Sequence, residues 1–526
     1  MKEIKLFALI GMLMLSITNT SAQSIDKENT YTITGKSKRG TLANVEELSN
    51  GDYKLYYITK STAKKAKFEI YTFDHDFNFK SVEEDIIEFE KIKAKYSWFN
   101  YNGELYSVDA ITLNWNPAMP LKLKKKRITY KYDWLFLGYY KTVEILDKVK
   151  PRTEDGKKYF AMKYFEDEIN GDIYIVAGVR SKLTSKDLDV NEQFTNLHVL
   201  KFDWDLNLVG DIPLKFEYPQ EIAFGAAIPN VSLENNEAVG VNGACVVFAP
   251  IKIPGKQYDK DPNKSNFTFV HFNEKMELKS RESFDSPSPG WRIEDLIYEQ
   301  NSDGSLNFFV YGPAAFGKDK YHQLAAQSAK MKSVQLMKVE NGKIKYLTEN
   351  TLEDIAAKGT FPPSQTKGAE YKGKKFQKAG YTSFSNGDII LTGQNFQPNS
   401  EKGNIYKDVL AFHFDDNGML KAQYGIDIKP AKISFASPQS ITENSNGAFW
   451  FITETSSVGN FFPSIGKIDL SNNSVGNFMT FGKVGKKQTY FTNKKFPMLK
   501  SGTDQVVYFG NDAKGKNIWF CRVNLK

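Results

Sequence analysis

Residues 200–207 read Leu-Lys-Phe-Asp-Trp-Asp-Leu-Asn, and residues 71–78 read Tyr-Thr-Phe-Asp-His-Asp-Phe-Asn. In both, a short apolar strand runs into a turn whose Asp and Asn side chains can bond the backbone two residues further on. Weaker copies recur along the chain, and the residues before these turns are Phe73, Tyr132, Phe202, Phe272, Val339, Phe414, Ile468 and Val523. Their spacing of 54 to 75 residues indicates a repeated structural unit.

A second kind of turn, built from Asn or Asp with Gly, precedes the acidic turn in most units. Tight hairpin turns need positive φ at both central residues, which Asn-Gly and Asp-Gly tolerate best. These turns lie at Asn50-Gly51, Asn102-Gly103, Asn170-Gly171, Asn235-Asn236, Asp303-Gly304, Asn386-Gly387, Asn446-Gly447 and, more loosely, Gly502-Thr503-Asp504. Each unit is therefore predicted to contain four strands, A to D, with tight A–B and C–D turns.

The length of the repeat suits a four-stranded blade with loops and is too long for a solenoid coil. We therefore predict an all-β fold, a single β-propeller over residues 23–526 with eight blades. Seven blades are the alternative, because the second and eighth units match the pattern least well. The eighth unit stops after its third strand, so residues 31–35 are expected to supply the fourth and close the ring. The alternative is a disordered tail over residues 23–40.

The N-terminus has the pattern of a signal peptide over residues 1–22. Lys2 and Lys5 precede an apolar run over residues 6–17, and small residues follow at positions 20–22. The run is too short to cross a bilayer of ~30 Å. We expect an exported protein that is periplasmic, outer-membrane-associated or at the cell surface, with no transmembrane segment after cleavage. In its Met-Lys start, its Ala22-Gln23 cleavage site and its Lys-, Asn- and Phe-rich body, the chain resembles exported proteins of Bacteroidota.

Charge and cysteine content narrow the function further. A formal net charge of +8 over 526 residues is too dilute to predict nucleic-acid binding. Cys245 and Cys521 fall in the fourth and eighth units, too far apart for a disulfide, so two buried free thiols are expected. Neither a metal-ligand spacing nor a Gly-x-Ser-x-Gly motif occurs. We therefore predict no metal, no cofactor and no catalytic residue.

Long connections are expected on one face only, and such a face usually binds the ligand. They cover residues 59–67, 112–127, 180–195, 250–267, 313–333, 351–378, 396–407 and 454–464. Cations interleaved with aromatic residues are typical of protein interfaces and glycan platforms. The binding candidates are Lys122, Lys124, Lys125, Lys126, Arg127, Trp115, Trp291, Phe316, Tyr321, Phe461 and Phe462.

Four further patterns in the sequence bear on the fold and on the site. Helices are expected over residues 321–331 and 351–359, and the repeated histidines His271 and His413 are expected to be structural. Residues 301–305 and 444–450 resemble the Asp-box turn of sialidase-type propellers, in which the box is a folding element away from the active site. The acids Asp109, Glu294 and Asp295 lie near predicted innermost strands and leave glycoside cleavage open.

Our first hypothesis is a non-enzymatic binding or scaffold propeller of the cell envelope. It would engage a protein partner, an outer-membrane complex, through the long loops of one face. In general form it resembles accessory propellers attached to outer-membrane machinery in Bacteroidota. The alternative is a carbohydrate-binding or glycan-cleaving propeller that acts on anionic glycan.

Overall fold

The computed structural model describes residues 23–61, 65–88, 106–114, 118–133, 138–167, 170–180, 190–231, 238–250, 267–288, 290–301, 304–315, 331–373, 375–398, 404–428, 430–432, 436–455, 460–493, 496–501 and 504–526. This part of the chain is all-β, with three short helices. The predicted signal peptide lies outside it. Among the residues described, no helix has the length and apolar character needed to cross a membrane.

Six of the sheets are built mainly from antiparallel neighbours in sequence, and we number them in chain order. Sheet 1 contains β2 (Thr41–Glu47), β3 (Tyr53–Ser61), β4 (Lys65–Phe73) and β5 (Phe79–Glu88). Sheet 2 contains β6 (Tyr106–Leu113), β7 (Leu123–Asp133) and β8 (Gly138–Val149). Sheet 3 contains β9 (Lys158–Glu166), β10 (Ile173–Arg180), β11 (Asn196–Phe202) and β12 (Leu208–Lys215).

The next three sheets follow the same plan. Sheet 4 contains β13 (Gln220–Val231), β14 (Ala238–Pro250), β15 (Phe267–Phe272) and β16 (Leu278–Phe284). Sheet 5 contains β17 (Gly290–Trp291), β18 (Asp295–Gln300), β19 (Leu306–Ala315), β20 (Ser333–Glu340) and β21 (Lys343–Thr351). Sheet 6 contains β22 (Gly359–Thr360), β23 (Phe376–Ser383), β24 (Ile389–Gln397), β25 (Ile405–Phe414), β26 (Leu420–Ile426) and β27 (Ala431–Lys432).

A ten-stranded sheet completes the chain, and its two halves are joined by a single pair, Phe461 with Thr492. Its first half contains β28 (Gln439–Asn444), β29 (Gly447–Thr455), β30 (Phe461–Asp469), β31 (Ser474–Val475) and β32 (Met479–Thr480). Its second half contains β35 (Tyr490–Thr492), β36 (Met498–Ser501), β37 (Gln505–Asp512), β38 (Asn517–Leu525) and β1 (Gln23–Thr32). A small hairpin, β33 (Lys483–Val484) with β34 (Lys487–Gln488), stands apart.

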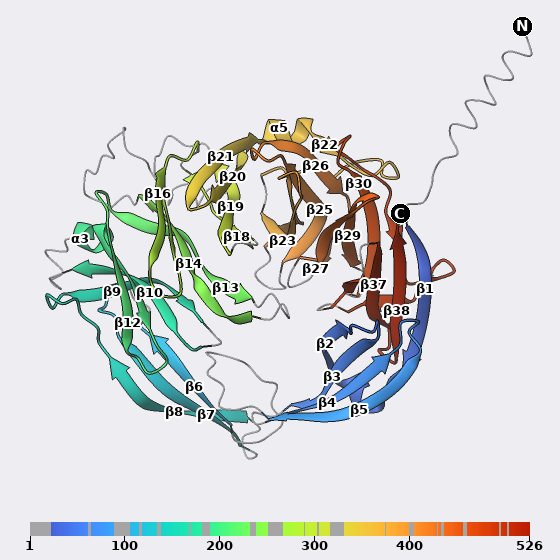
Figure 1. Ribbon diagram of the computed structural model, residues 1–526, viewed down its shortest axis with the longest axis horizontal. Helices are drawn as coiled ribbons and strands as arrows, with labels where there is room; N and C mark the ends of the chain where they lie inside the picture. Colours follow the sequence, from blue (N-terminus) through green and yellow to red (C-terminus); the bar gives the residue numbers. More distant parts are fainter. Residues whose placement is uncertain are drawn as a thin grey trace, which may run out of the picture.

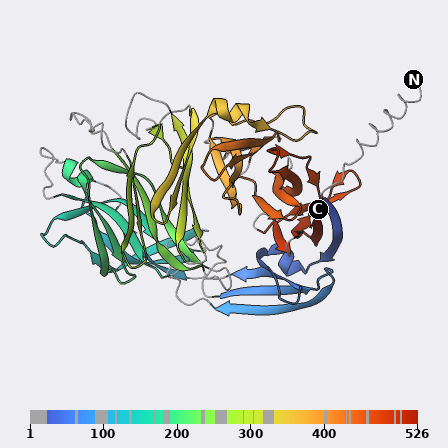
Figure 2. The same ribbon diagram turned by 45° about the horizontal axis from the view of Figure 1, so that its top comes forward.

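The sheets follow one another clockwise around a common centre, starting from sheet 1 at the lower right (Figure 1), and the tilted view keeps this order (Figure 2). Buried apolar clusters fill the spaces between neighbouring sheets. Between sheets 4 and 5, for example, the rings of Phe269 and Phe308 lie 5.6 Å apart. Similar clusters join the halves of the ten-stranded sheet and connect its second half to sheet 1. Within the described residues, none joins sheet 1 to sheet 2.

The predicted pairing of the two chain ends is confirmed. Strand β1 runs antiparallel to β38, from the Gln23–Leu525 pair to the Thr32–Asn517 pair. The strand lies earlier than expected because Thr34 instead caps the short helix α2 (Gly35–Arg39). The alternative of a disordered tail over residues 23–40 was wrong.

The acidic turns form as their sequences predict, but the Asn-Gly turns at 50–51, 170–171 and 386–387 differ from the predicted form, because only the glycine and not the Asn before it has positive φ. Gly51, Gly171 and Gly387 have φ values of 81°, 78° and 87°, a region that favours glycine. In the acidic turns, one carboxylate oxygen of Asp74 accepts hydrogen bonds from two backbone N–H groups. Asp203 does the same. Side chain and backbone together therefore satisfy these turns.

Other predictions of local structure have mixed outcomes. Helix α5 (Leu352–Ala357) forms within the predicted range, and Thr351 and Asp354 form its capping box. Both cysteines are buried and free, as expected. The predicted helix over residues 321–331 falls mostly outside the described residues. Of the long connections, 59–67 is mainly a hairpin of β3 and β4. Most of 180–195, 250–267, 313–333, 396–407 and 454–464 is either strand or lies outside the described residues.

Candidate functional site

The strand directions define two rims of the molecule. The end of each sheet where strands B and D finish is called the loop rim, and the end with the A–B and C–D turns is called the turn rim. Three pockets lie at the loop rim, between sheets 5 and 6, sheets 2 and 3, and sheets 3 and 4. The predicted binding face thus contains cavities.

The pocket between sheets 5 and 6 has a volume of about 490 Å³. The residues just before β18 and at its start contribute charged groups, while β23 and β24 contribute aromatic rings and a second cation. The lining residues that carry its chemistry are Arg292, Glu294, Asp295, Phe376, Lys378 and Phe396. The pocket therefore combines two cations, two carboxylates and aromatic walls.

Glu294 is the least solvated carboxylate of this pocket. Its side chain is 18 % exposed and lies beside Arg292, whose Nε donates to it over 3.1 Å. Burial raises the pKa of Glu294, although the attraction of Arg292 opposes this. Asp295 likewise forms an ion pair, with Lys378, and its side chain is more exposed, at 34 %. The two neighbouring acids therefore differ in their exposure to solvent.

The pocket between sheets 2 and 3 is rich in cations and has a volume of about 340 Å³. Its basic lining residues are Lys122, Lys150, Arg152 and Lys158. The ammonium group of Lys124 lowers the pKa of Lys122, and burial, Lys150 and Lys148 add to this effect. The local field therefore favours an anion. We call this region the basic pocket.

The lysine-rich segment over residues 121–127 lies partly at this pocket and partly in strand β7. It was expected to be a loop, but Lys124, Lys125, Lys126 and Arg127 lie in β7, where side chains alternate between faces. Lys125 pairs with Asp205 at 2.6 Å and lies over the ring of Trp204. Arg127 makes two hydrogen bonds to Asp109. Of the predicted cations, only Lys122 lines the basic pocket.

The predicted aromatic contacts are largely corrected by burial. Trp291 is fully buried and donates its indole N–H to the carbonyl of Gly312, so it belongs to the core. Phe461 and Phe462 lie in strand β30 and not in a loop; Phe461 is buried and Phe462 is half-buried. Trp115, Phe316 and Tyr321 lie outside the described residues.

Several residues of these pockets were missed from the sequence. Arg292, Lys378, Lys150, Arg152 and Lys158 lie at or near strand ends, and the charged segments 148–158 and 372–378 that contain four of them were not singled out. The signal that could have found them is their position after strand D or at the start of strand A. Glu294 and Asp295 were noted from the sequence, and the structure places them together with Arg292.

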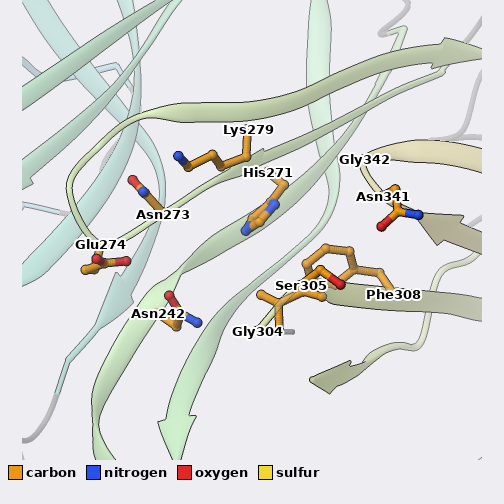
Figure 3. Close-up of a pocket in the computed structure, with 11 residues that line it drawn as sticks. Asn242, His271, Asn273, Glu274, Lys279, Gly304, Ser305, Phe308, Asn341 and Gly342 are labelled. Carbon is orange, nitrogen blue, oxygen red and sulfur yellow. The ribbon is translucent and has the colours of Figure 1, made fainter. Parts of the chain in front are cut away.

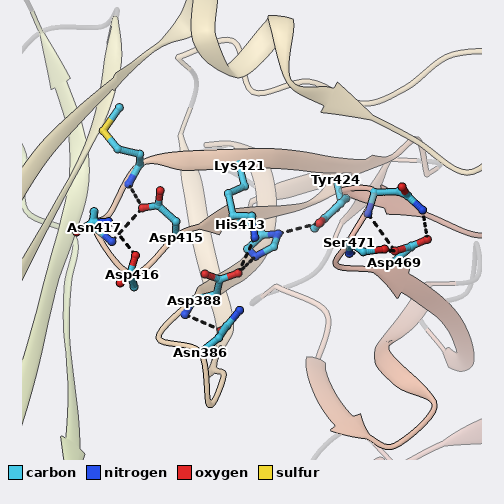
Figure 4. A network of polar contacts seen from close by, with 12 residues as sticks. Asn386, Asp388, His413, Asp415, Asp416, Asn417, Lys421, Tyr424, Asp469 and Ser471 are labelled. Atoms are coloured by element: carbon cyan, nitrogen blue, oxygen red, sulfur yellow. Dashed lines mark hydrogen bonds and ion pairs between the residues drawn. The ribbon is translucent and has the colours of Figure 1, made fainter.

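A fourth pocket, of about 350 Å³, lies at the turn rim between sheets 4 and 5. His271 and Phe308 line its interior, and Asn242, Lys279 and Asn341 lie around it (Figure 3). The equivalent region of sheet 6 instead holds a closed polar network centred on His413 (Figure 4). No group of three or more potential metal ligands occurs among the residues that the structure covers.

No protein-family model and no curated protein sequence matches the chain. Solved structures similar to it include an ulvan lyase of polysaccharide lyase family PL25 bound to -[GlcA(1-4)Rha3S]-. The two chains are 9 % identical, the alignment covers 86 % of this chain and 97 % of the lyase, and the TM-score is 0.28. An exo-β-1,3-galactanase from Clostridium thermocellum has 10 % identity, with 96 % and 100 % covered and a TM-score of 0.23. The exotype rhamnogalacturonan lyase YesX has 9 % identity, with 91 % and 88 % covered and a TM-score of 0.23.

These findings correct the first functional hypothesis. A non-enzymatic scaffold for a protein partner was expected, but the similar structures are mostly carbohydrate-active enzymes. They agree with the alternative, a protein that acts on glycan. With TM-scores of 0.23 to 0.28, these similarities assign no substrate to this chain.

Proposed function

We propose that the chain is an eight-bladed propeller that binds anionic glycan at its loop rim, with Glu294 as a proton donor for cleavage. Sheets 1 to 6 and the two halves of the ten-stranded sheet supply eight blades. The pairing of β1 with β38 supports closure at the chain ends. Seven buried clusters support the packing of consecutive blades at every interface except the one between sheets 1 and 2.

The observation that carries the function is the pocket between sheets 5 and 6. Anionic glycan offers carboxylate or sulfate groups and apolar sugar faces. Arg292 and Lys378 provide cations for the former, and the rings of Phe376 and Phe396 provide surfaces for the latter. A guanidinium has five N–H donors in a fork that suits an oxyanion. Because Arg292 bonds Glu294 and Lys378 pairs with Asp295, an acidic sugar would share these cations with the two carboxylates.

Glu294 supplies the chemistry that a simple binding site does not need. A carboxyl group whose pKa is raised by burial keeps its proton closer to neutral pH and can donate it to a leaving oxygen. Asp295, paired with Lys378, is the second carboxylate within the same pocket. Together they provide an acid and an anionic stabiliser for the breakage of a glycosidic bond.

The basic pocket extends the proposed binding face. Its cations lie at the same rim, between sheets 2 and 3, where a polyanionic chain would gain from several contacts. Export to the periplasm or outer membrane, with residues 1–22 removed, is part of the proposal because acidic polysaccharides occur outside the cytoplasm. This localisation rests on the sequence pattern alone.

Incubation of the purified protein with acidic and neutral polysaccharides tests the proposal. We expect new reducing ends, or a new ultraviolet absorbance if the bond breaks by elimination, with acidic substrates only. Glu294→Gln should abolish product formation, whereas Glu370→Gln, an exposed acid on the segment between sheets 5 and 6, should not. Equal turnover by the Glu294→Gln variant, or no binding of any acidic polysaccharide, would contradict the proposal.

A further inference from the structure

The turn-rim pocket contains a buried polar atom without a partner. His271 is only 8 % exposed, and its Nε2 makes no hydrogen bond with the residues that the structure describes. Burying a polar group without a hydrogen bond costs stability. His271 lines a cavity of about 350 Å³, as Figure 3 shows, so a ligand could reach this atom.

The same position in sheet 6 shows which partner is missing. Phe414 pairs with Ile389 in sheet 6, and Phe272 pairs with Ala244 in sheet 4. His413 and His271, which precede these Phe residues, therefore occupy equivalent positions. Asp388 in sheet 6 and Gly243 in sheet 4, which precede Ile389 and Ala244, are equivalent as well. By the same register, Lys421 corresponds to Lys279.

In sheet 6, the carboxylate joins the two basic groups. Asp388 lies 2.9 Å from His413 Nε2 and 2.9 Å from Lys421 Nζ (Figure 4). Two other sheets keep this acid as well, with Asp52 paired to Lys80 at 2.7 Å and Asp172 paired to Lys201 at 3.1 Å. Sheet 4 keeps both basic residues and lacks the acid.

Position 243 in sheet 4 cannot accommodate an acidic side chain. Gly243 has a φ of 92°, and a Cβ at this position would meet the carbonyl oxygen of Phe272 at 1.9 Å. Any side chain here is therefore excluded by both the backbone conformation and the packing. The space that the carboxylate of Asp388 fills in sheet 6 remains part of a pocket in sheet 4.

We propose that this pocket binds the carboxylate of a small acidic molecule, which takes the place of Asp388 by accepting a hydrogen bond from His271 Nε2 and pairing with Lys279. Asn242, Ser305 and Asn341 also line the pocket and can bond hydroxyl groups on the rest of the ligand. The site lies on the rim opposite the proposed glycan-binding face, so it does not depend on that proposal.

His271, Lys279 and Glu274 define the electrostatics of the site. Burial lowers the pKa of His271 to about 4, so the ring is a neutral N–H donor near pH 7. Lys279 also pairs with Glu277 at 2.6 Å, and both side chains are about half exposed, at 47 % and 55 %. Glu274 lines the pocket with a negative charge that opposes an incoming carboxylate. Removal of that charge should therefore strengthen binding.

Nuclear magnetic resonance of protein labelled at its five histidines tests the proposal with sodium acetate, sodium glucuronate and glucose. We expect both carboxylates, but not glucose, to shift the His271 resonance in a saturable manner. Tighter binding of glucuronate than acetate would identify an acidic sugar as the better source of the carboxylate, and equal binding would identify the carboxylate alone as the recognised group. The resonance is assigned by its loss in His271→Leu.

Matched variants separate this site from a nonspecific effect. Lys279→Gln removes an exposed cation without disturbing the core and should weaken carboxylate binding about tenfold or more. Glu274→Gln should strengthen it, and Lys275→Gln, an exposed charge on the same turn, should leave it unchanged. The proposal fails if glucose shifts the resonance equally, if no carboxylate shifts it, or if Lys279→Gln and Glu274→Gln have no effect.

Discussion

The indole Nε1 of Trp519 donates a hydrogen bond of 2.6 Å to the carboxylate of Glu28, although the two residues are 491 positions apart. This contact lies within the pairing of β1 and β38, which covers the edge of the last sheet. Uncovered edges present unpaired N–H and C=O groups that can join other chains. Loss of this contact should therefore destabilise the fold and favour association through the exposed edge.

Trp519→Phe should lower the free energy of unfolding by about 1–3 kcal/mol, because the buried aromatic packing remains while a hydrogen bond to a charged group is lost. Urea denaturation measures the effect. Lys27→Ala removes a neighbouring side chain of β1 whose ion pair is 4.0 Å long and exposed, and should change stability by less than about 0.5 kcal/mol. Equal effects of the two substitutions would count against the contact.

Deletion of residues 1–32 should have a larger effect than either substitution. It leaves β38 as an open edge and removes Tyr31, whose ring stacks on Phe79 at 4.5 Å. We expect a lower melting temperature and concentration-dependent association, detected by light scattering. A monomeric deletion variant with unchanged stability would show that β1 does not close the fold.

Glu294→Gln should reduce turnover of an acidic polysaccharide by about a hundredfold or more, which is the usual contribution of general acid catalysis. Binding should change much less. The rate should also decline on the alkaline side at a pH above the ordinary carboxyl pKa of 4.5, because burial raises the pKa of Glu294. A pH–rate profile of the wild-type enzyme measures this, and an alkaline decline at or below pH 4.5 would rule out Glu294 as the acid.

The double variant Lys122→Glu, Lys150→Glu should weaken binding of a polyanionic glycan and reduce the dependence of affinity on salt. Both residues line the basic pocket, and charges at a surface act through a field that salt screens. Isothermal titration calorimetry at two ionic strengths measures both effects. Lys275→Glu, at the opposite rim, is the control and should bind as the wild type does; equal losses in both variants would indicate a general charge effect.

The stability of the fold should fall as the pH decreases from 6.5 to 4. Burial lowers the pKa of His271 from 6.5 to about 4, so the unfolded chain binds a proton in this range that the folded chain does not. The stabilisation is complete above pH 6.5 and is lost below it, by at most about 3 kcal/mol. His271→Leu should show a smaller loss between pH 7 and pH 4.5 in urea denaturation. An identical pH dependence in both proteins would contradict the assignment.

Much of the fold could be predicted from the sequence because its repeated turns depend on local chemistry. The positive φ of Gly51 and Gly387 and the backbone bonds of Asp74 and Asp203 are set by neighbouring residues alone. The pairing of the chain ends could be predicted as well, because the last unit lacks a strand.

The site was harder to predict because it depends on contacts between sheets. Lys125 and Phe461 were assigned to loops on composition, but alternation in a strand turns one toward Asp205 and the other into the core. Trp291 was expected at the surface, and its burial follows from packing against Phe267. Arg292 and Glu294 are only two positions apart, but their meeting with Phe376 and Lys378 of the next sheet depends on the fold. The missing acid beside His271 appears only when the sheets are compared.

The strand pairing of residues 23–32 with residues 517–525 also sets the timing of folding. Strand β1 has no partner until residues 517–525 have been synthesised. Closing so long a segment carries an entropic cost that rises with the logarithm of its length. This pairing therefore forms only after all the intervening sheets have been made.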